Sequence, residues 1–568
     1  MEPPESRWTS RRLPSAMRSW HHRRARRGSN RQTLAEVRPM GVKVLFIVKE
    51  IEGAEPLGAL YVAGCLEQAG HECKFIGTRG NDVLAEVRRY GPDVIAFGAT
   101  TGLHRYYLGL NHHIKQHYPK AVSLMGGPHA TYYPEVIQTP GLDVVCQGEG
   151  EDAAVELCDA LARGDDHRGI RDLWVKSEGK IYRNPARGLR RDLDAIPFPP
   201  RRLLYEYDDS LRRRPLKSFT TNRGCPFPCS YCFNPSLVEH YGSSWKKVRV
   251  RSPENVVAEL AHVMKQGPLQ FVGFRESIFV YDAEWLRQFG ELYRREVKLP
   301  YYCHLRADMM TEEMVDLLAW SGCYTVNVGI ETANPELANG VLRRQIRMDR
   351  LVHGIRLLKR AGIVVFADNI LGIPGGTLED DLATLELNIE LDVDYAAATL
   401  CTPYPGTGIA AYAVEHGHFS GDFDLIDDSY YTESVLRFSS DEEKRQIENL
   451  HKVFAVTAAI PALLPLMKRL IRLPSNDFFY AMFRAWYLVC HMTDVMPRRL
   501  ELAELVNSAL SIFGVYRGAD ENRYPAPAPE ALPIVEPPAQ AACGDTRTVQ
   551  LRRRPRIAAE SAEVPDVR

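Results

Sequence analysis

The sequence has no long hydrophobic run and no marked excess of either charge. Its most apolar stretch, Val453 to Met467, is too short to span a bilayer and contains Pro461 and Pro465. Lysine and arginine number 71 against 72 aspartate and glutamate, for a formal net charge of −1, so neither nucleic acid nor an anionic membrane is expected as the main partner. A secretory signal is also lacking, which disfavours a secreted disulfide scaffold and favours a reduced, cytoplasmic protein.

The chain of 568 residues is long enough for two or three globular domains, and its 45% apolar and 25% charged residues are ordinary for them. The arginine-rich segment 1–40 has no apolar period and is expected to be disordered, or to precede a translation start at Met40. Composition then indicates a domain at 41–165, a proline-stiffened connector at 166–215, a core at 216–410, a small helical domain at 411–516 and a disordered proline-rich tail at 517–568.

Three of the twelve cysteines lie close together, as Cys225, Cys229 and Cys232 in the spacing C-x3-C-x2-C. Iron–sulfur clusters are held by cysteine thiolates, normally four of them, so three thiolates leave one iron open to a small molecule. Structural zinc prefers two cysteine pairs that close four ligands, and the sequence has no second pair. The spacing therefore favours a cluster over zinc, with three buried or reactive cysteines as the alternative.

With Tyr231 as its aromatic residue, this loop resembles the C-x3-C-x-aromatic-C signature of the radical S-adenosylmethionine (SAM) enzymes. The resemblance implies that Cys225, Cys229 and Cys232 hold a 4Fe–4S cluster, and that Tyr231 packs beside the cluster or the adenine. It also implies that the amine and carboxylate of SAM chelate the fourth iron. An electron from a flavodoxin- or ferredoxin-type donor would then cleave SAM to methionine and a 5′-deoxyadenosyl radical.

Strand and helix patterns alternate six times in the predicted core, which indicates an incomplete (β/α)6 barrel of TIM type. Active sites of such barrels lie at the carboxyl ends of the strands. By resemblance to the family, Glu276 and Glu331 would contact polar groups of SAM, and Gly372 and Pro374 would follow the adenine. Arg306 is suited to a carboxylate because guanidinium makes bidentate charge-assisted bonds. An ordinary ion pair or turn is the alternative at each position.

In the 41–165 domain, buried-strand runs alternate with helices, which predicts a Rossmann-like, doubly wound α/β fold with a parallel sheet. Ligands of such sheets bind at the carboxyl ends of the strands, where small residues let the backbone approach a large flat ligand. A G-x-G-x-x-G motif after the first strand is missing, which disfavours NAD but leaves another nucleotide as an alternative. The candidate binding residues in these loops are Thr100, Thr101, Gly126, Gly127, Pro128, His129, Gly148 and Glu149.

Gly-Gly-Pro-His-Ala-Thr at 126–131 and Gly-Glu-Gly-Glu at 148–151, placed before a radical SAM core, resemble the cobalamin-binding domain of cobalamin-dependent radical SAM proteins. The D-x-H-x-x-G sequence by which other cobalamin proteins supply a lower axial histidine is absent. We therefore expect cobalamin to bind without that histidine. We expect His129 to bond to the backbone or the corrin edge rather than to cobalt.

These resemblances imply a cobalamin-dependent radical SAM methyltransferase. It would use methylcobalamin and a second SAM to methylate an unactivated carbon, or a phosphinate phosphorus as P-methylases of antibiotic biosynthesis do. The expected substrate is a small-molecule natural-product intermediate. Alternatives are a non-methylating cobalamin-dependent cyclase or rearrangement enzyme, a methylthiotransferase, and a non-enzymatic sensor that binds both cofactors. The aromatic helices of the 411–516 domain are expected to form a core, with a substrate lid as the alternative.

Overall fold

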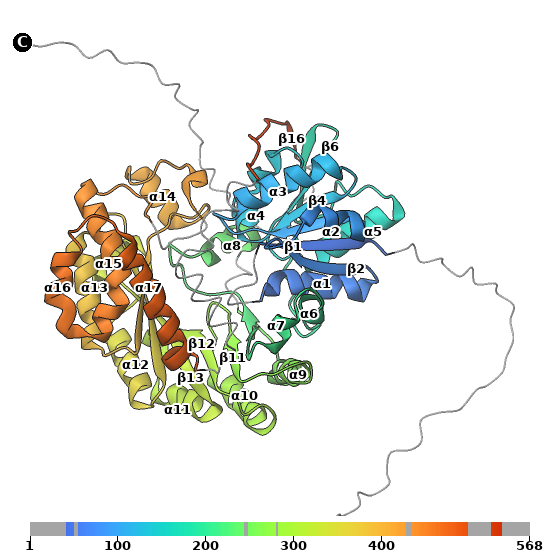
Figure 1. The fold of residues 1–568 in the computed structure, drawn as a ribbon. Coiled ribbons are helices and arrows are strands. Elements are labelled where there is room, and N and C mark those ends of the chain that lie inside the picture. The colour runs from blue at the N-terminus through green and yellow to red at the C-terminus, as the bar shows by residue number, and fades with distance from the viewer. Residues whose placement is uncertain are drawn as a thin grey trace, which may run out of the picture. The chain divides into compact units, whose positions relative to one another are not determined.

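The computed structural model describes residues 41–49, 55–242, 248–279, 282–427, 433–497 and 524–536 (Figure 1). The arginine-rich segment 1–40 lies outside the described residues, as do residues 498–523, where the expected helical domain ends and the tail begins. None of the described helices is both long and apolar enough to cross a membrane.

The first sheet has eight strands in the order β16-β7-β6-β5-β4-β3-β1-β2. Its strands are β1 (Lys43–Val48), β2 (Glu72–Gly77), β3 (Val94–Gly98), β4 (Val122–Gly126), β5 (Val144–Cys146), β6 (Leu173–Ser177), β7 (Lys180–Arg183) and β16 (Ile534–Val535). Its main helices are α1 (Leu57–Ala69), α2 (Val83–Tyr90), α3 (His104–His117) and α5 (Glu151–Arg163). β1 to β5 pair parallel with one another, as expected.

Alternate residues of β1 are buried on opposite faces of this sheet. Val44 and Phe46 pack with residues of α1 and α5, whereas Leu45 and Ile47 pack with residues of α2 and α3. A strand that is apolar on both faces is the mark of a parallel sheet covered by helices on each side. The doubly wound architecture is therefore confirmed.

Local sequence signals set the ends of these elements. α1 ends where Gly70 adopts a left-handed conformation with φ 98°, which disfavours a residue with a Cβ. α2 begins after Asp82, whose side chain accepts a bond from the Ala85 N–H. The Gly-Gly-Pro-His segment, expected as a loop, instead starts helix α4 (Pro128–Tyr132) and the 3-10 turn η1 (Pro134–Gln138), because proline suits the first helical position.

Two later segments extend the first sheet. The β6–β7 hairpin, expected within the connector, pairs antiparallel with β5. β16 pairs parallel with β7, and the Ile181 N–H donates to Pro533 O at 2.9 Å. We expected disorder throughout 517–568, and residues 524–536 depart from that expectation. The reason is that the open edge of β7 offers backbone groups that an extended, proline-rich chain can pair.

The second sheet has six parallel strands in the order β15-β14-β13-β12-β11-β8, so each strand lies beside the next one in the chain. They are β8 (Leu216–Phe219), β11 (Phe271–Phe274), β12 (Tyr301–Leu305), β13 (Cys323–Glu331), β14 (Val364–Leu371) and β15 (Tyr395–Leu400). The connecting helices are α9 (Pro253–Met264), α10 (Ala283–Glu296), α11 (Glu312–Ser321), α12 (Met348–Arg360) and α13 (Leu378–Glu390), all on the outside of the strands (Figure 1). This arrangement confirms the incomplete barrel.

The sequence pattern predicts the first barrel strand at 219–222, whereas β8 lies earlier, at Leu216–Phe219. The sequence pattern misses the start of β8 because Lys217 is polar. In the structure Lys217 can lie inside the strand because its buried ammonium donates to the Leu211 carbonyl. Residues 222–223 form β9 (Asn222–Arg223), which pairs with β10 (Arg249–Val250) in a separate two-stranded ribbon. The remaining elements here are α6 (Arg202–Tyr207), α7 (Asp209–Arg213), α8 (Asn234–Tyr241), α14 (Gly408–Glu415), the 3-10 turns η3 (Ala307–Met309) and η5 (Phe423–Leu425), and the π-helical turn η4 (Leu337–Val341).

From Asp441 to Val495 the chain is mainly helical, as expected. Its elements are α15 (Asp441–Ala459), the 3-10 turn η6 (Pro461–Leu463), α16 (Leu464–Leu470), α17 (Asp477–Cys490) and the π-helical turn η7 (His491–Val495). Apolar residues of α15 share one core with the barrel strands, among them Val453 and Phe454. These helices therefore stabilise the barrel by packing against it.

Candidate active site

The three cysteines lie on one loop that follows β9 and leads into α8. Gly224 begins the loop with φ 106°, a conformation that favours glycine, directly before Cys225. Cys229 is buried, and Cys225 and Cys232 are half-buried. The loop is delivered from the carboxyl end of β8, where the barrel architecture places active sites.

Ser230 pins the middle of this loop to neighbouring elements. Its N–H donates to Leu342 O at 2.8 Å, and its hydroxyl donates to Val341 O at 2.6 Å. Its carbonyl accepts from the Ile409 N–H of α14 at 2.8 Å. Ser230 thus satisfies carbonyls at the end of the π-helical turn η4, and such turns occur frequently at functional sites.

The surroundings of the thiols suit a negatively charged cluster. Burial raises the pKa of Cys225 to about 11, and it also raises the pKa of Cys229. The Arg306 charge acts to lower the pKa of both thiols, and the Arg344 charge acts to lower the pKa of Cys229. Metal ligation requires thiolates, so these guanidinium groups would favour the ligating form and offset the charge of a bound cluster.

The donor chemistry of the three thiols bears on which metal group they could hold. A zinc ion needs its ligands around one centre, whereas a cube spreads thiolate ligands over separate iron atoms. The donor set of three thiols beside two arginines therefore fits the cluster better than zinc, and the ligand roles of the three cysteines stay a prediction.

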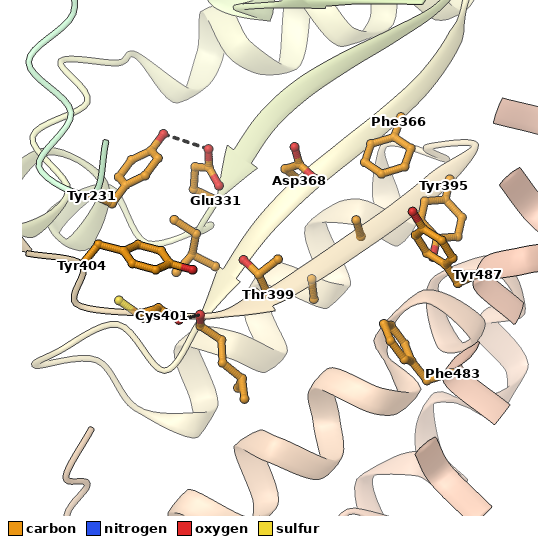
Figure 2. A pocket seen from close by; sticks show the side chains of 15 residues that line it. Tyr231, Glu331, Phe366, Asp368, Tyr395, Thr399, Cys401, Tyr404, Phe483 and Tyr487 are labelled. Atoms are coloured by element: carbon orange, nitrogen blue, oxygen red, sulfur yellow. Dashed lines mark hydrogen bonds between the residues drawn. The ribbon is translucent and has the colours of Figure 1, made fainter. Parts of the chain in front are cut away.

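Tyr231 and Glu331 meet beside the cysteine loop (Figure 2). The Tyr231 hydroxyl donates to Glu331 Oε1 at 2.8 Å. Glu331 ends β13 with φ 66°, an uncommon conformation for a residue with a side chain. Arg344 supports this turn by donating to Gly329 O at 2.7 Å and Ile330 O at 2.6 Å.

Glu331 is buried, with 7% of its surface exposed, and it borders the cavity that opens beside Tyr231. Burial raises the pKa of Glu331, although Arg344 and the Tyr231 hydroxyl oppose the shift. The carboxyl is thus held in place as a hydrogen-bonding group at the rim of the cluster loop. Contact of Glu331 with polar groups of SAM stays a prediction.

Arg306 and Glu276 already have protein partners. Arg306 binds the Asp308 carboxylate through two bonds of 2.9 and 3.0 Å, and its guanidinium carbon lies 3.9 Å from the Phe227 ring centroid. The Glu276 carboxylate accepts from the Thr221 N–H at 3.1 Å and the Thr221 hydroxyl at 3.0 Å, and burial raises its pKa to about 7. In the structure Arg306 therefore contacts the cysteine loop at Phe227, and Glu276 holds Thr221, which lies just before that loop.

The Gly372–Pro374 loop follows β14. Gly372 has φ 68°, and its N–H donates to Asp381 Oδ2 at 3.0 Å. A Cβ on Gly372 would lie 2.9 Å from Phe438 Cζ, so only glycine fits without a shift of the neighbouring ring. Contact of Gly372 and Pro374 with adenine stays a prediction.

The candidate loops of the first sheet are bonded to one another. The His129 N–H donates to Ala99 O at 3.0 Å, and its Nδ1 lies 3.0 Å from the Thr101 hydroxyl. The Gly148 N–H donates to the Thr131 hydroxyl at 3.0 Å. A Cβ on Gly127, which has φ 92°, would lie 2.8 Å from Ala99 O. The small residues therefore serve first to bring the β3, β4 and β5 loops together, with Thr100, Gly126 and Pro128 at the same strand ends.

His129 is buried and neutral. Its ring stacks on His104 at 3.8 Å between centroids, and burial together with His104 lowers its pKa to about 2. Its Nε2 is buried and has no hydrogen-bond partner among the described residues. Nδ1 takes part in loop hydrogen bonding through Thr101, and the expectation that His129 does not ligate cobalt stays a prediction.

Glu149 makes ion pairs that the sequence did not reveal. Its carboxylate accepts from Arg249 at 2.6 and 3.0 Å and lies 3.4 Å from Arg223. Arg223 also pairs with Glu151 at 2.5 Å. Burial acts to raise the pKa of Glu149, but the two guanidinium groups outweigh it, and the pKa lies below its ordinary value. The Glu149 carboxylate is engaged with the ribbon that flanks the cysteine loop, and its expected contact with the cofactor stays a prediction.

Sequence reasoning missed Arg344 and Asp368. Arg344 lies among several arginines after η4, and nothing local distinguishes it. Asp368 stands beside Asn369 within strand β14, whose other residues are apolar, and it borders the cavity near Glu331 (Figure 2). A carboxyl inside a parallel barrel strand is itself a signal, because buried acidic residues are rare unless they have a partner or a function.

Comparison with known protein families identifies both halves of the chain. The model of the B12 binding domain matches residues 47–158, and that of the radical SAM superfamily matches residues 219–387. The chain belongs to the cobalamin-dependent radical SAM family. Its cofactors are accordingly a 4Fe–4S cluster, SAM and cobalamin.

Curated relatives of this cobalamin-dependent radical SAM protein include methyltransferases and a cyclase. An uncharacterised methyltransferase of Pyrococcus horikoshii is 29% identical over 390 residues, covering 66% of this chain and 83% of the relative. The anaerobic magnesium-protoporphyrin IX monomethyl ester cyclase of Rubrivivax gelatinosus is 27% identical, covering 64% and 68%. The cytidylyl-2-hydroxyethylphosphonate methyltransferase of Streptomyces wedmorensis is 24% identical, covering 64% and 78%. By family, the enzyme class of this chain is radical SAM methyltransferase.

Two solved structures share the fold. The radical SAM methyltransferase TsrM of Kitasatospora setae, with cobalamin and a 4Fe–4S cluster bound, aligns with TM-score 0.55 at 22% identity over 66% of this chain and 75% of that one. The cobalamin-dependent radical enzyme OxsB aligns with TM-score 0.59 at 15% identity over 84% and 76%. At these identities the likeness establishes the fold.

Proposed function

We propose that the protein methylates an unactivated carbon or a phosphinate phosphorus of a small natural-product intermediate. The observation that carries this proposal is the cysteine loop, because its Tyr231 bonds to Glu331 at the border of a cavity of about 390 Å³. Cavities of roughly 300–1,000 Å³ are typical of small-molecule sites. A non-nucleophilic acceptor cannot attack a sulfonium methyl group, so a radical route with a separate methyl carrier suits this architecture.

When bound, the cluster supplies the electron that cleaves SAM, and cobalamin carries the methyl group between a second SAM and the acceptor. Each turnover would use two SAM and two electrons from a flavodoxin- or ferredoxin-type donor. The products would be the methylated acceptor, 5′-deoxyadenosine that carries the acceptor hydrogen, methionine and S-adenosylhomocysteine, so that atoms and charge balance.

The roles of the chain follow from the contacts above. Cys225, Cys229 and Cys232 would hold the cluster, and Ser230 fixes their loop. Glu331 would orient SAM through its polar groups, held by its bond from Tyr231. The Thr100, Gly126 and Gly148 loops would present backbone groups to cobalamin at the carboxyl ends of the first sheet.

Anaerobic reconstitution followed by product analysis tests this function. The full chain, with cluster, cobalamin and SAM labelled by a trideuteromethyl group, is incubated with reductant and a metabolite extract. Methyl transfer predicts a metabolite that gains one labelled methyl group, with equal amounts of 5′-deoxyadenosine and S-adenosylhomocysteine that depend on cobalamin. Labelled product that forms without cobalamin would contradict the proposal.

A cyclase function is the second candidate, because a curated relative is a cyclase. It predicts 5′-deoxyadenosine without S-adenosylhomocysteine and no labelled metabolite. The same reaction mixture therefore separates the two functions.

A further inference from the structure

The cavity beside Tyr231 continues along the barrel to an aromatic end. Strands β14 and β15 form its floor, and α17 faces them (Figure 2). Ala397 and Ala398 of β15 line it with small side chains, which leaves the space open. One end therefore belongs to the cluster loop, and the rest remains available to a second molecule.

The far end of the cavity is built from rings. Phe366 and Tyr395 lie 5.0 Å apart between centroids, and α17 contributes Phe483 and Tyr487, whose rings lie 6.4 Å apart. Rings in such tilted arrangements offer faces and edges to an apolar or aromatic group. Their faces also attract a cation.

The charged side chains of the described residues that line the cavity are all acidic. Its described lining residues include two carboxyl groups, Glu331 and Asp368, and no lysine or arginine. Glu331 has the Arg344 charge and the Tyr231 hydroxyl nearby, whereas the side-chain partner of Asp368 is the neutral Asn327 amide. Burial and the Glu331 charge raise the pKa of Asp368 to about 7. Asp368 is half-buried, and a carboxylate so placed without a cation among the described lining residues is costly, so a cationic ligand group would relieve that cost.

We propose that the methyl acceptor carries a basic nitrogen beside an apolar ring, that the nitrogen pairs with Asp368, and that the ring lies against Phe366, Tyr395, Phe483 and Tyr487. The inference rests on the proposed function, in which SAM uses its own amine and carboxylate at the cluster. Asp368 lies between the aromatic rings and the Tyr231–Glu331 pair, as Figure 2 shows. An acceptor held this way would reach from the rings toward the cluster loop.

Binding of a matched probe series tests this inference without requiring turnover. The probes are 2-phenylethylamine, 2-phenylethanol and 3-phenylpropionate, which share a ring and differ in charge. Binding to the full chain, reconstituted with cluster, cobalamin and SAM, is measured by calorimetry. A charge-assisted bond to Asp368 predicts that the amine binds about tenfold or more tightly than the alcohol, and that the carboxylate binds most weakly.

Two variants in the cavity and one control variant outside it test which side chain selects the amine. Asp368→Asn should weaken amine binding about tenfold or more while leaving the alcohol unchanged, because shape is kept and charge is lost. Asp392→Asn is the control, since Asp392 is 92% exposed outside the cavity and carries the same charge. Phe483→Leu should weaken all three probes alike.

Three results would overturn the inference. The alcohol or carboxylate could bind the native protein as tightly as the amine, Asp368→Asn could weaken amine and alcohol equally, or it could abolish SAM binding, which would assign Asp368 to the cofactor. Because these measurements need no methyl transfer, they remain informative even where labelled SAM yields no methylated product. That latter outcome would contradict the proposed function instead.

Discussion

A buried carboxylate shared by two arginines offers a quantitative test of the fold. Arg201 donates to Glu259 at 2.8 Å and to Ser218 O at 2.6 Å, and Arg251 donates to the other Glu259 oxygen at 2.6 Å. Arg201 and Glu259 have no exposed surface, and Arg251 retains 5%. Burial acts to lower the pKa of Arg201, but the carboxylates of Glu55 and Glu259 outweigh it and raise the pKa.

Replacing Glu259 with glutamine keeps the shape of the side chain and removes its charge. Arg201 retains Glu55, whose carboxylate lies 3.3 Å away, but Arg251 loses its ion pair with Glu259. Breaking a buried ion pair from one side costs about 3–5 kcal/mol, because it leaves an uncompensated charge in the interior. At about 2–4 °C per kcal/mol for an unfolding unit of roughly 150–250 residues, Glu259→Gln should lower Tm by roughly 6–20 °C.

Glu390→Gln is the matched control for this measurement. Glu390 pairs with Arg356 at 3.1 Å, but the two side chains are 65% and 57% exposed. Exposed pairs contribute about 0–1 kcal/mol, so this variant should melt within about 4 °C of the native protein. Differential scanning calorimetry of both variants decides the matter. Equal shifts in Tm would refute the argument that burial gives the Glu259 pairs their weight.

Three further predictions concern the site and its supports. Cys229→Ser should abolish iron binding to the core and all SAM cleavage, whereas Cys73→Ser, at a buried thiol of β2, should retain both in iron analysis and product chromatography. Gly372→Ala should lower stability in urea by about 1–3 kcal/mol more than Gly362→Ala, because both have positive φ but only Gly372 would meet a neighbouring ring. For Glu276, the folded pKa of about 7 exceeds the ordinary value of 4.5, so ionisation opposes folding as pH rises. Glu276→Gln should therefore gain about 3 kcal/mol relative to the native protein between pH 4.5 and pH 8, as measured by denaturation at both pH values; a gain toward low pH would contradict the sign.

Local patterns were enough for much of the fold. The apolar run of β1 and the capping signals at Gly70 and Asp82 are read within a few residues of chain, and the structure keeps them. The strand β8 was misplaced because a charged residue such as Lys217 is not expected inside a buried strand. The bond from its ammonium to the Leu211 carbonyl, which makes this position possible, exists only in the folded chain. The same limit applies to the tail, whose pairing depends on the open edge of β7 rather than on its own composition.

The residues of the candidate site show the same difference between local patterns and contacts that form only on folding. The cysteine spacing and the strand-end position of Glu331 are local, so the sequence located them. The partner of Glu149 is Arg249, 100 residues away, and that ion pair exists only once the chain has folded. A carboxylate in a loop that resembles a family motif is therefore a weak guide to ligand contact, because any arginine that folding brings near competes for it.

Asp368 is the opposite case, because its proposed role follows from the absence of a cationic partner among the described residues of the cavity. In the sequence it stands with Asn369 among the apolar residues of a strand, and in the structure its carboxyl faces a cavity that holds rings and a second carboxyl but no cation from the described lining. Neutral replacement would relieve the cost of burying that charge, so Asp368→Asn should leave the folded protein as stable as the native protein or more stable at pH 8. If acceptor binding falls in the same variant, stability and recognition oppose each other at this position. That opposition is expected of a group kept for a ligand and not for the fold, and a variant that loses both together would place Asp368 in the structural core instead.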